Sequence, residues 1–199
     1  MSTQETRLAD YGIDLKIRFL KLNSNLYDRY VQPRHFDCEQ DSINEHIYDK
    51  ALDAYSTTYI FIDDGCDRMI CFCTFSCSGV MELTDTDNDV FIARENFRVT
   101  SAMEINYFAV DKRYQHLPFE PSSEKGDTLS RYLLNYMQKH LCQIAANHIG
   151  AERIILYAVP KAKRFYMGCG FRPFEGQMTG QGWDYVQGCP PMYYDIVVK

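Results

Sequence analysis

The sequence predicts an α/β protein in which a mixed, mostly antiparallel central sheet is flanked by helices. Two adjacent apolar segments, TYIFID and MICFCTFSC, are joined by a short polar turn, which is typical of an antiparallel hairpin. Later in the chain, strand-like and helical segments alternate, which is typical of strands covered by helices. With 199 residues, the chain is expected to form one domain, 1–199, with a sizeable core.

The chain is expected to begin with a strand followed by a helix. Residues 13–22, IDLKIRFLKL, alternate apolar and polar side chains, as in a half-buried strand. Residues 37–55 repeat apolar side chains every three or four positions, which predicts an amphipathic helix. We expect Asp41 or Ser42 as its N-cap, because Glu45 would complete a capping box with the serine.

The hairpin strands are expected at 58–63 and 69–77. Within the second strand, Cys71, Cys73 and Cys77 fall at even offsets and therefore on one face. We interpret them as small buried apolar residues, because their spacing matches no paired zinc motif. No metal site is predicted.

The second half of the chain alternates between strands and helices. A polar, irregular loop with some local structure is expected over 82–101, and a Pro-bearing loop over 112–126. Leucine and methionine repeat at helical spacing between Asp127 and Asn147, and Gly150 follows as a stop signal. The remaining strands are expected at 103–111, 152–159 and 192–198, with a short helix at 161–168 and a Gly- and Gln-rich loop at 176–190.

Charge and composition narrow the class of partner. The formal net charge is −6, whereas a broad nucleic-acid surface needs an excess of basic residues, so we expect no nucleic-acid partner. The first residues are polar, and no apolar stretch approaches the roughly 20 residues that span a bilayer. We therefore expect a cytoplasmic protein with no membrane partner and reduced cysteines.

The segment 158–171, AVPKAKRFYMGCGF, joins the end of a strand to a short helix that stops at glycine. The string Phe-Tyr-x-x-x-Gly-Phe within it resembles the acyl-CoA-dependent N-acetyltransferases of the GNAT family. The resemblance implies that Tyr166 protonates the departing coenzyme A thiolate, with Ala162 and Phe165 beside the cofactor. Without the resemblance, Tyr166 is a core aromatic at a helix–sheet seam.

The strand EINYFAV, residues 104–110, is similar to a glutamate-bearing strand of the histone-acetyltransferase branch of that family. The resemblance implies that Glu104 is the general base, since an ammonium group must lose a proton before it attacks a thioester. It also implies that the main chain at Phe108, Ala109 and Val110 pairs with the pantetheine arm. Alone, Glu104 fits a strand-edge glutamate that faces solvent.

The strand end AVDKRYQ leads through a loop to the next helix, whose free N–H groups and dipole favour a bound anion. In the GNAT family this loop holds the cofactor pyrophosphate, and Gln115 matches its first residue. About a dozen residues intervene here, and hydroxyl residues stand where the family has glycines. The alternative is an ordinary loop and a helix capped by Asp127 or Thr128. The predicted contacts are Gln115, Gly126, Thr128, Leu129 and Ser130.

The resemblance covers about residues 36–198 and implies an N-acetyltransferase. Acetyl-CoA would be the co-substrate, bound between the strands ending near Val110 and Val159, and the acetyl group would pass directly to a primary amine of a small molecule or protein.

An alternative is a tRNA-directed acetyltransferase toxin paired with an antitoxin, since FDCEQDSINEHI resembles the helix start of a subgroup with such toxins. A second alternative is a non-catalytic acyl-CoA-binding or interaction protein. A homodimer is compatible with each.

Overall fold

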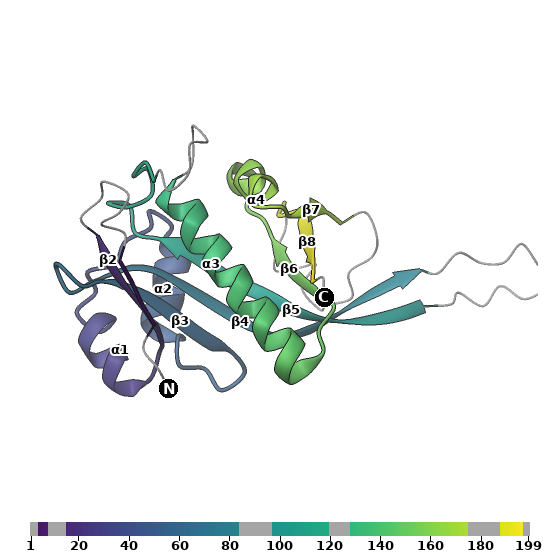
Figure 1. Cartoon of the computed structure of the whole chain (residues 1–199), viewed down its shortest axis with the longest axis horizontal. Coiled ribbons are helices and arrows are strands. Elements are labelled where there is room, and N and C mark those ends of the chain that lie inside the picture. The colour runs from purple at the N-terminus through teal and green to yellow at the C-terminus, as the bar shows by residue number, and fades with distance from the viewer. Residues whose placement is uncertain (1–3, 8–14, 84–96, 120–127, 175–187, 197–199) are drawn as a thin grey trace, which may run out of the picture. The chain divides into compact units, whose positions relative to one another are not determined.

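A computed structural model describes residues 4–7, 15–83, 97–119, 128–174 and 188–196 (Figure 1). The chain divides into two compact units. The first contains Met1–Ser76 and Asn106–Met137, and the second contains Cys77–Ile105 and Gln138–Lys199. Strands β4 (Arg68–Leu83) and β5 (Phe97–Val110) and helix α3 (Leu129–Ile144) each contribute to both units.

The first unit is an antiparallel sheet with helices on both faces. Strands β1 (Gln4–Arg7), β2 (Lys16–Lys21), β3 (Thr57–Asp63) and β4 are hydrogen-bonded in that order, each antiparallel to the next. Helices α1 (Ser24–Tyr30) and α2 (Asp41–Asp49) pack on one face, and the start of α3 packs on the other.

Alternation along β3 explains the two faces of this sheet. Ile60 and Ile62 are fully buried against α1 and α2, whereas Phe61 is buried against α3. Strand side chains point to opposite faces in turn, so one fully apolar strand contributes to two cores. The predicted hairpin of β3 and β4 is confirmed, with a register shift at Phe61 and Ile62.

The second unit contains the only parallel pairing among the described strands. Strand β5 pairs in parallel with β6 (Arg153–Tyr157), from Ala102 opposite Arg153 to Ile105 opposite Leu156. Strand β8 (Pro191–Asp195) is antiparallel to both β6 and β7 (Arg172–Pro173). The mixed, mostly antiparallel sheet with flanking helices is thus confirmed.

The helices of the second unit follow the sequence pattern closely. Helix α3 continues into a π-helical turn, Ala145–Ile149, which ends at Gly150 with a φ of 62°. A left-handed backbone favours glycine, so the predicted stop is confirmed. The predicted helix over 161–168 consists of a 3₁₀ turn, Pro160–Ala162, and helix α4 (Lys163–Gly168).

The sequence expectations for one helix cap and for two strand bounds are wrong. The N-cap of α2 is Gln40, not Asp41 or Ser42, and its side chain makes no capping hydrogen bond. Strand β4, expected to end at 77, extends to Leu83, and β5, expected to begin at 103, begins at Phe97, so the local structure expected within 82–101 is found at its ends. The hydrogen bonds between strands are made by the main chain and do not require apolar side chains. The start of β5 can therefore form without the apolar pattern that predicted the other strands.

The cysteines differ in exposure. Cys71 and Cys73 are fully buried, and burial raises the pKa of both thiols. Cys77 is exposed, so the expectation that it shares their buried environment is wrong. Cys66, in the turn between β3 and β4, is also exposed. Among the described residues, no helix is both long and apolar enough to cross a membrane.

Candidate functional site

The last five residues of β5 lie in the first unit, beyond the parallel ladder that ends at Ile105. Ala109 packs in the core beside α1 and α2, and Val110 packs in the core beside α3, where Phe108 is half-buried. Their side chains therefore serve packing. A ligand along this segment would have to use main-chain groups, which is the mode of pairing predicted for the pantetheine arm.

Gln115 holds together the turn that follows β5. Its Nε2 donates to the carbonyl of Val110 at 2.9 Å and to that of Cys38 at 3.3 Å. Its own carbonyl accepts from the Ser130 hydroxyl at 3.0 Å. The structure thus brings Gln115, Val110 and Ser130 together in one hydrogen-bonded group at the start of α3.

The N-terminus of α3 is closed by groups of the protein itself. Thr128 Oγ1 accepts a hydrogen bond from the Arg131 amide at 3.4 Å, so the alternative expectation that Thr128 caps this helix is confirmed. The Leu129 amide donates to the Leu117 carbonyl at 3.0 Å, and the Leu129 side chain is fully buried. Phosphate binding at Thr128, Leu129 and Ser130 stays a prediction, and Gly126 lies outside the described residues.

Glu104 lies on β5 in the second unit, opposite Ile155 of β6. Its carboxylate accepts a hydrogen bond from the Ser78 hydroxyl at 3.0 Å and is half-buried. On β6, burial raises the pKa of Tyr157, and the negative charge of Glu104 raises it further. Glu104 is thus a carboxylate held in place by a hydroxyl and electrostatically coupled to a phenol.

Tyr166 is held in an aromatic group at the end of α4. Its ring lies edge-on to Phe171, with centroids 5.8 Å apart, and it is buried, whereas the adjacent Phe165 is half-buried. Between them, Gly170 has a φ of 87°, and a Cβ there would come within 3.2 Å of the Tyr194 ring. The glycine of the FYxxxGF string therefore allows the turn that brings Phe171 beneath Tyr166.

A side chain of α3 also holds the end of α4 in place. Gln138, which is buried, donates from Nε2 to the Cys169 carbonyl at 3.1 Å. The carbonyls at a helix end lack intrahelical partners, so this side chain satisfies one of them. Ala162, where α4 begins, is half-buried. The sequence predicted that Tyr166 lies on a short helix. It gave no indication that Gln138 contacts this helix, because Gln138 lies 28 residues before Tyr166 in the chain.

His46 of α2 is a buried histidine that the sequence offered only as part of a helix motif. Its ring stacks on Tyr107 of β5 with centroids 3.7 Å apart, and its Nε2 lies 3.3 Å from the Thr74 hydroxyl. Thr74 in turn lies 2.9 Å from the Thr58 hydroxyl. Burial, together with the charge of Lys50, lowers the pKa of His46 to about 4. The imidazole is therefore neutral at pH 7.

This histidine should make stability depend on pH between about 6.5 and 4. In that range the unfolded chain binds a proton at His46 and the folded chain does not, so acid favours unfolding. The loss is expected to reach up to about 3 kcal/mol at pH 4. Urea unfolding at several pH values should show this loss, and His46→Phe, which keeps a ring beside Tyr107, should remove it. An unchanged pH profile in the variant would contradict the assignment.

Sequence comparisons find no matching family model and no matching curated protein. Solved structures do match. A bacterial toxin shares 17% identity and a TM-score of 0.64, covering 90% of each chain. A tyrosine-to-phenylalanine mutant of the toxin AtaT shares 13% identity and a TM-score of 0.66, covering 90% of this chain and 89% of the other.

Other structures of such toxins hold ligands or partners. AtaT complexed with acetyl-methionyl-tRNA matches with 15% identity and a TM-score of 0.60, covering 90% of this chain and 94% of the other. Further matches include AtaT bound to acetyl-CoA and to its antitoxin AtaR. The chain therefore has the fold of the GNAT-type acetyltransferase toxins, as its motifs predicted.

Proposed function

We propose that this protein is an acetyl-CoA-dependent N-acetyltransferase whose acceptor is the α-amine of an aminoacyl-tRNA. The observation that carries the proposal is the likeness, over 90% of the chain, to toxins that include one complexed with acetyl-methionyl-tRNA. Two sequence motifs support it as well: FYxxxGF supports acetyl transfer, and the helix start FDCEQDSINEHI supports a tRNA acceptor. This acceptor replaces the expectation of no nucleic-acid partner.

The transfer would be direct. Glu104, held by the Ser78 hydroxyl, takes a proton from the acceptor ammonium. The free amine attacks the thioester carbonyl, the carbon–sulfur bond breaks, and the Tyr166 hydroxyl gives its proton to the departing thiolate. The second proton that the nitrogen loses as the amide forms restores the Tyr166 hydroxyl. An α-ammonium group is easier to deprotonate than a lysine side chain, because its pKa of about 8 is far below the value of about 10.4 for lysine.

The cofactor would rest largely on main-chain groups. We place the pantetheine arm along Phe108, Ala109 and Val110, whose side chains are committed to packing. In the second unit, Ala162 and Phe165, which lie close to Tyr166 in the chain, stay the predicted contacts of the cofactor. The pyrophosphate would lie at the loop that Gln115 braces and at the start of α3.

The test is to incubate the purified protein with acetyl-CoA and methionyl-tRNA and to measure thiol release together with the mass of the aminoacyl group. We expect N-acetylmethionine on the tRNA, and no reaction with free methionine or with a lysine peptide. Thiol release with the peptide alone would contradict the tRNA acceptor. Saturable acetyl-CoA binding in calorimetry with no turnover on any amine would support a non-catalytic binding protein.

A second candidate is transfer to an amine of a small molecule or protein. The observation that favours it is the formal net charge of −6, because a long-range electrostatic attraction to RNA is then absent. The peptide and free-amine reactions in the same experiment separate it from the first candidate.

Glu104 offers a variant that isolates the base. Glu104→Gln keeps the side-chain shape and its contact with Ser78 but removes the proton acceptor. We expect kcat to fall about 10²-fold or more at pH 7, with a smaller loss at high pH, where the acceptor amine is already neutral. Ser78→Ala, which leaves the carboxylate, should cost much less. Equal activity of wild type and Glu104→Gln from pH 6 to 9 would exclude Glu104 as the base.

A further inference from the structure

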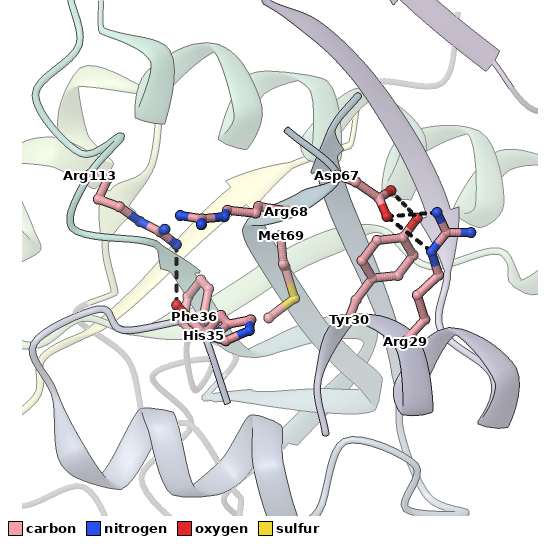
Figure 2. A pocket seen from close by; sticks show the side chains of 8 residues that line it. All are labelled: Arg29, Tyr30, His35, Phe36, Asp67, Arg68, Met69 and Arg113. Carbon is pink, nitrogen blue, oxygen red and sulfur yellow. Dashed lines mark hydrogen bonds and ion pairs between the residues drawn. The ribbon is translucent and has the colours of Figure 1, made fainter. Parts of the chain in front are cut away.

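A small basic pocket lies in the first unit, away from Glu104 and Tyr166 in the sequence (Figure 2). Its buried floor is formed by the side chains of Tyr30, Phe36 and Met69. Its volume is about 30 Å³. It can therefore take one small chemical group. The polar lining residues are Arg29, His35, Asp67, Arg68 and Arg113.

The one acid in the lining is already neutralised. Asp67 accepts hydrogen bonds from Arg29 at 2.6 Å, from Arg18 at 3.1 Å and from the Tyr30 hydroxyl at 2.8 Å. Arg29 and the Tyr30 hydroxyl lower the pKa of Asp67. This side of the pocket thus carries no uncompensated negative charge that would repel an anion.

The other side carries two arginines, and one of them is fixed. Arg113 makes a bidentate pair with the buried carboxylate of Asp111, at 2.7 and 2.9 Å, and donates to the His35 carbonyl at 3.2 Å. Its guanidinium is therefore rigid before any ligand arrives. A fixed guanidinium loses little conformational freedom when it binds.

Arg68 supplies the unsatisfied charge. Within the described part of the chain, its guanidinium has no hydrogen-bond or ion-pair partner. Figure 2 shows it extending toward the Arg113 guanidinium, over His35 and Phe36. Asp111 already compensates the charge of Arg113, so the uncompensated positive charge in the lining is that of Arg68. An anion beside Arg68 would pair with this charge and could also accept from Arg113.

We infer that this pocket binds a single phosphate group through Arg68 and Arg113. The guanidinium of Arg68 and the N–H groups of Arg113 that Asp111 and His35 do not take would donate to the oxygens of a phosphate. The group could come from the backbone of an RNA or from the nucleotide end of a coenzyme A. These two sources rest on the proposed function, but the inference concerns binding only and does not depend on the transfer chemistry.

The test uses Arg68, because it is exposed and its loss should not affect folding. Binding of fluorescently labelled, unacylated tRNA is measured across salt concentrations for wild type, Arg68→Ala and Arg68→Lys. Lys21→Ala is the matched control, since Lys21 is an exposed cation at the end of β2 remote from the β3–β4 turn. A second arm compares coenzyme A with 3′-dephospho-coenzyme A. Thermal unfolding verifies that each variant is folded.

If RNA supplies the phosphate, Arg68→Ala should weaken tRNA binding about tenfold and lower the slope of log Kd against log salt by about one. Arg68→Lys should restore part of the affinity, and Lys21→Ala should change neither quantity. If the cofactor supplies it, Arg68→Ala should weaken coenzyme A about tenfold and leave the dephospho form unaffected. Equal binding by wild type and Arg68→Ala in both arms would overturn the inference. Transfer activity is measured separately, so either proposal can fail alone.

Discussion

Replacing Tyr166 with phenylalanine should lower kcat of acetyl transfer by about 10²- to 10⁴-fold, with little change in acetyl-CoA affinity. The ring would still pack edge-on against Phe171, so the helix α4 should keep its place. Only the hydroxyl is lost, and with it the proton for the departing thiolate. Stopped-time thiol release gives kcat, and calorimetric titration with acetyl-CoA gives the affinity.

The matched control is Tyr194→Phe, which removes a hydroxyl from the ring that packs against Phe171 and Gly170. It should retain near wild-type kcat. If Tyr166→Phe keeps full activity, or if both variants lose it equally, Tyr166 has no special role as an acid and acts through packing.

Replacing Asp111 with alanine should lower the free energy of unfolding by about 3 kcal/mol, the largest loss that we expect from a single polar side chain here. Its side chain is fully buried and accepts from the amides of Asp37 and Arg113, each at 3.0 Å, as well as from the Arg113 guanidinium. Burial is the largest single influence and would raise the pKa of this carboxyl, but the hydrogen bonds from Arg113 and the Asp37 amide, together with the charge of Arg113, lower it overall.

Urea unfolding of Asp111→Ala, with Asp49→Ala as the control, checks this expectation. Asp49 pairs with Arg34 at 3.2 Å, but both side chains are more than half exposed, so its loss should cost less than about 1 kcal/mol. Asp111→Asn, which can still accept hydrogen bonds, should fall between the two. Equal losses for Asp111→Ala and Asp49→Ala would show that the buried contacts contribute nothing beyond a surface pair.

The local pattern of apolar residues was sufficient to predict most helices and strands. It was not sufficient for elements that are short or that form only by pairing with residues distant in the sequence. The β3–β4 hairpin, α3 and β6 carry periodic apolar residues and were predicted. Helix α1 was missed because seven residues are too few for a periodic signal, although Asn23 caps it by accepting from the Leu26 amide. The two-residue strand β7 exists only through its pairing with β8.

The same distinction holds for the candidate sites. Glu104 and Tyr166 lie within short motifs, so their elements could be predicted, but their neighbours Ser78 and Gln138 could not. The basic pocket combines Arg68, which belongs to no motif, with Arg113, which lies within AVDKRYQ but has no predicted role there, and the two are far apart in the chain. Such sites follow from the way strands are ordered in a sheet, which no local pattern encodes.

The unequal burial of the cysteines has a chemical consequence for handling and labelling the protein. Attack by oxidants and alkylating reagents requires a thiolate that the reagent can reach. Cys71 and Cys73 meet neither condition, because they are enclosed and their pKa values are raised. Cys66 and Cys77 are open to solvent, so they are the first positions for a reporter dye and the first points of cross-linking between molecules when reductant is withdrawn. Cys66 lies in the turn next to Asp67 and Arg68, and a dye there would report directly on that basic surface.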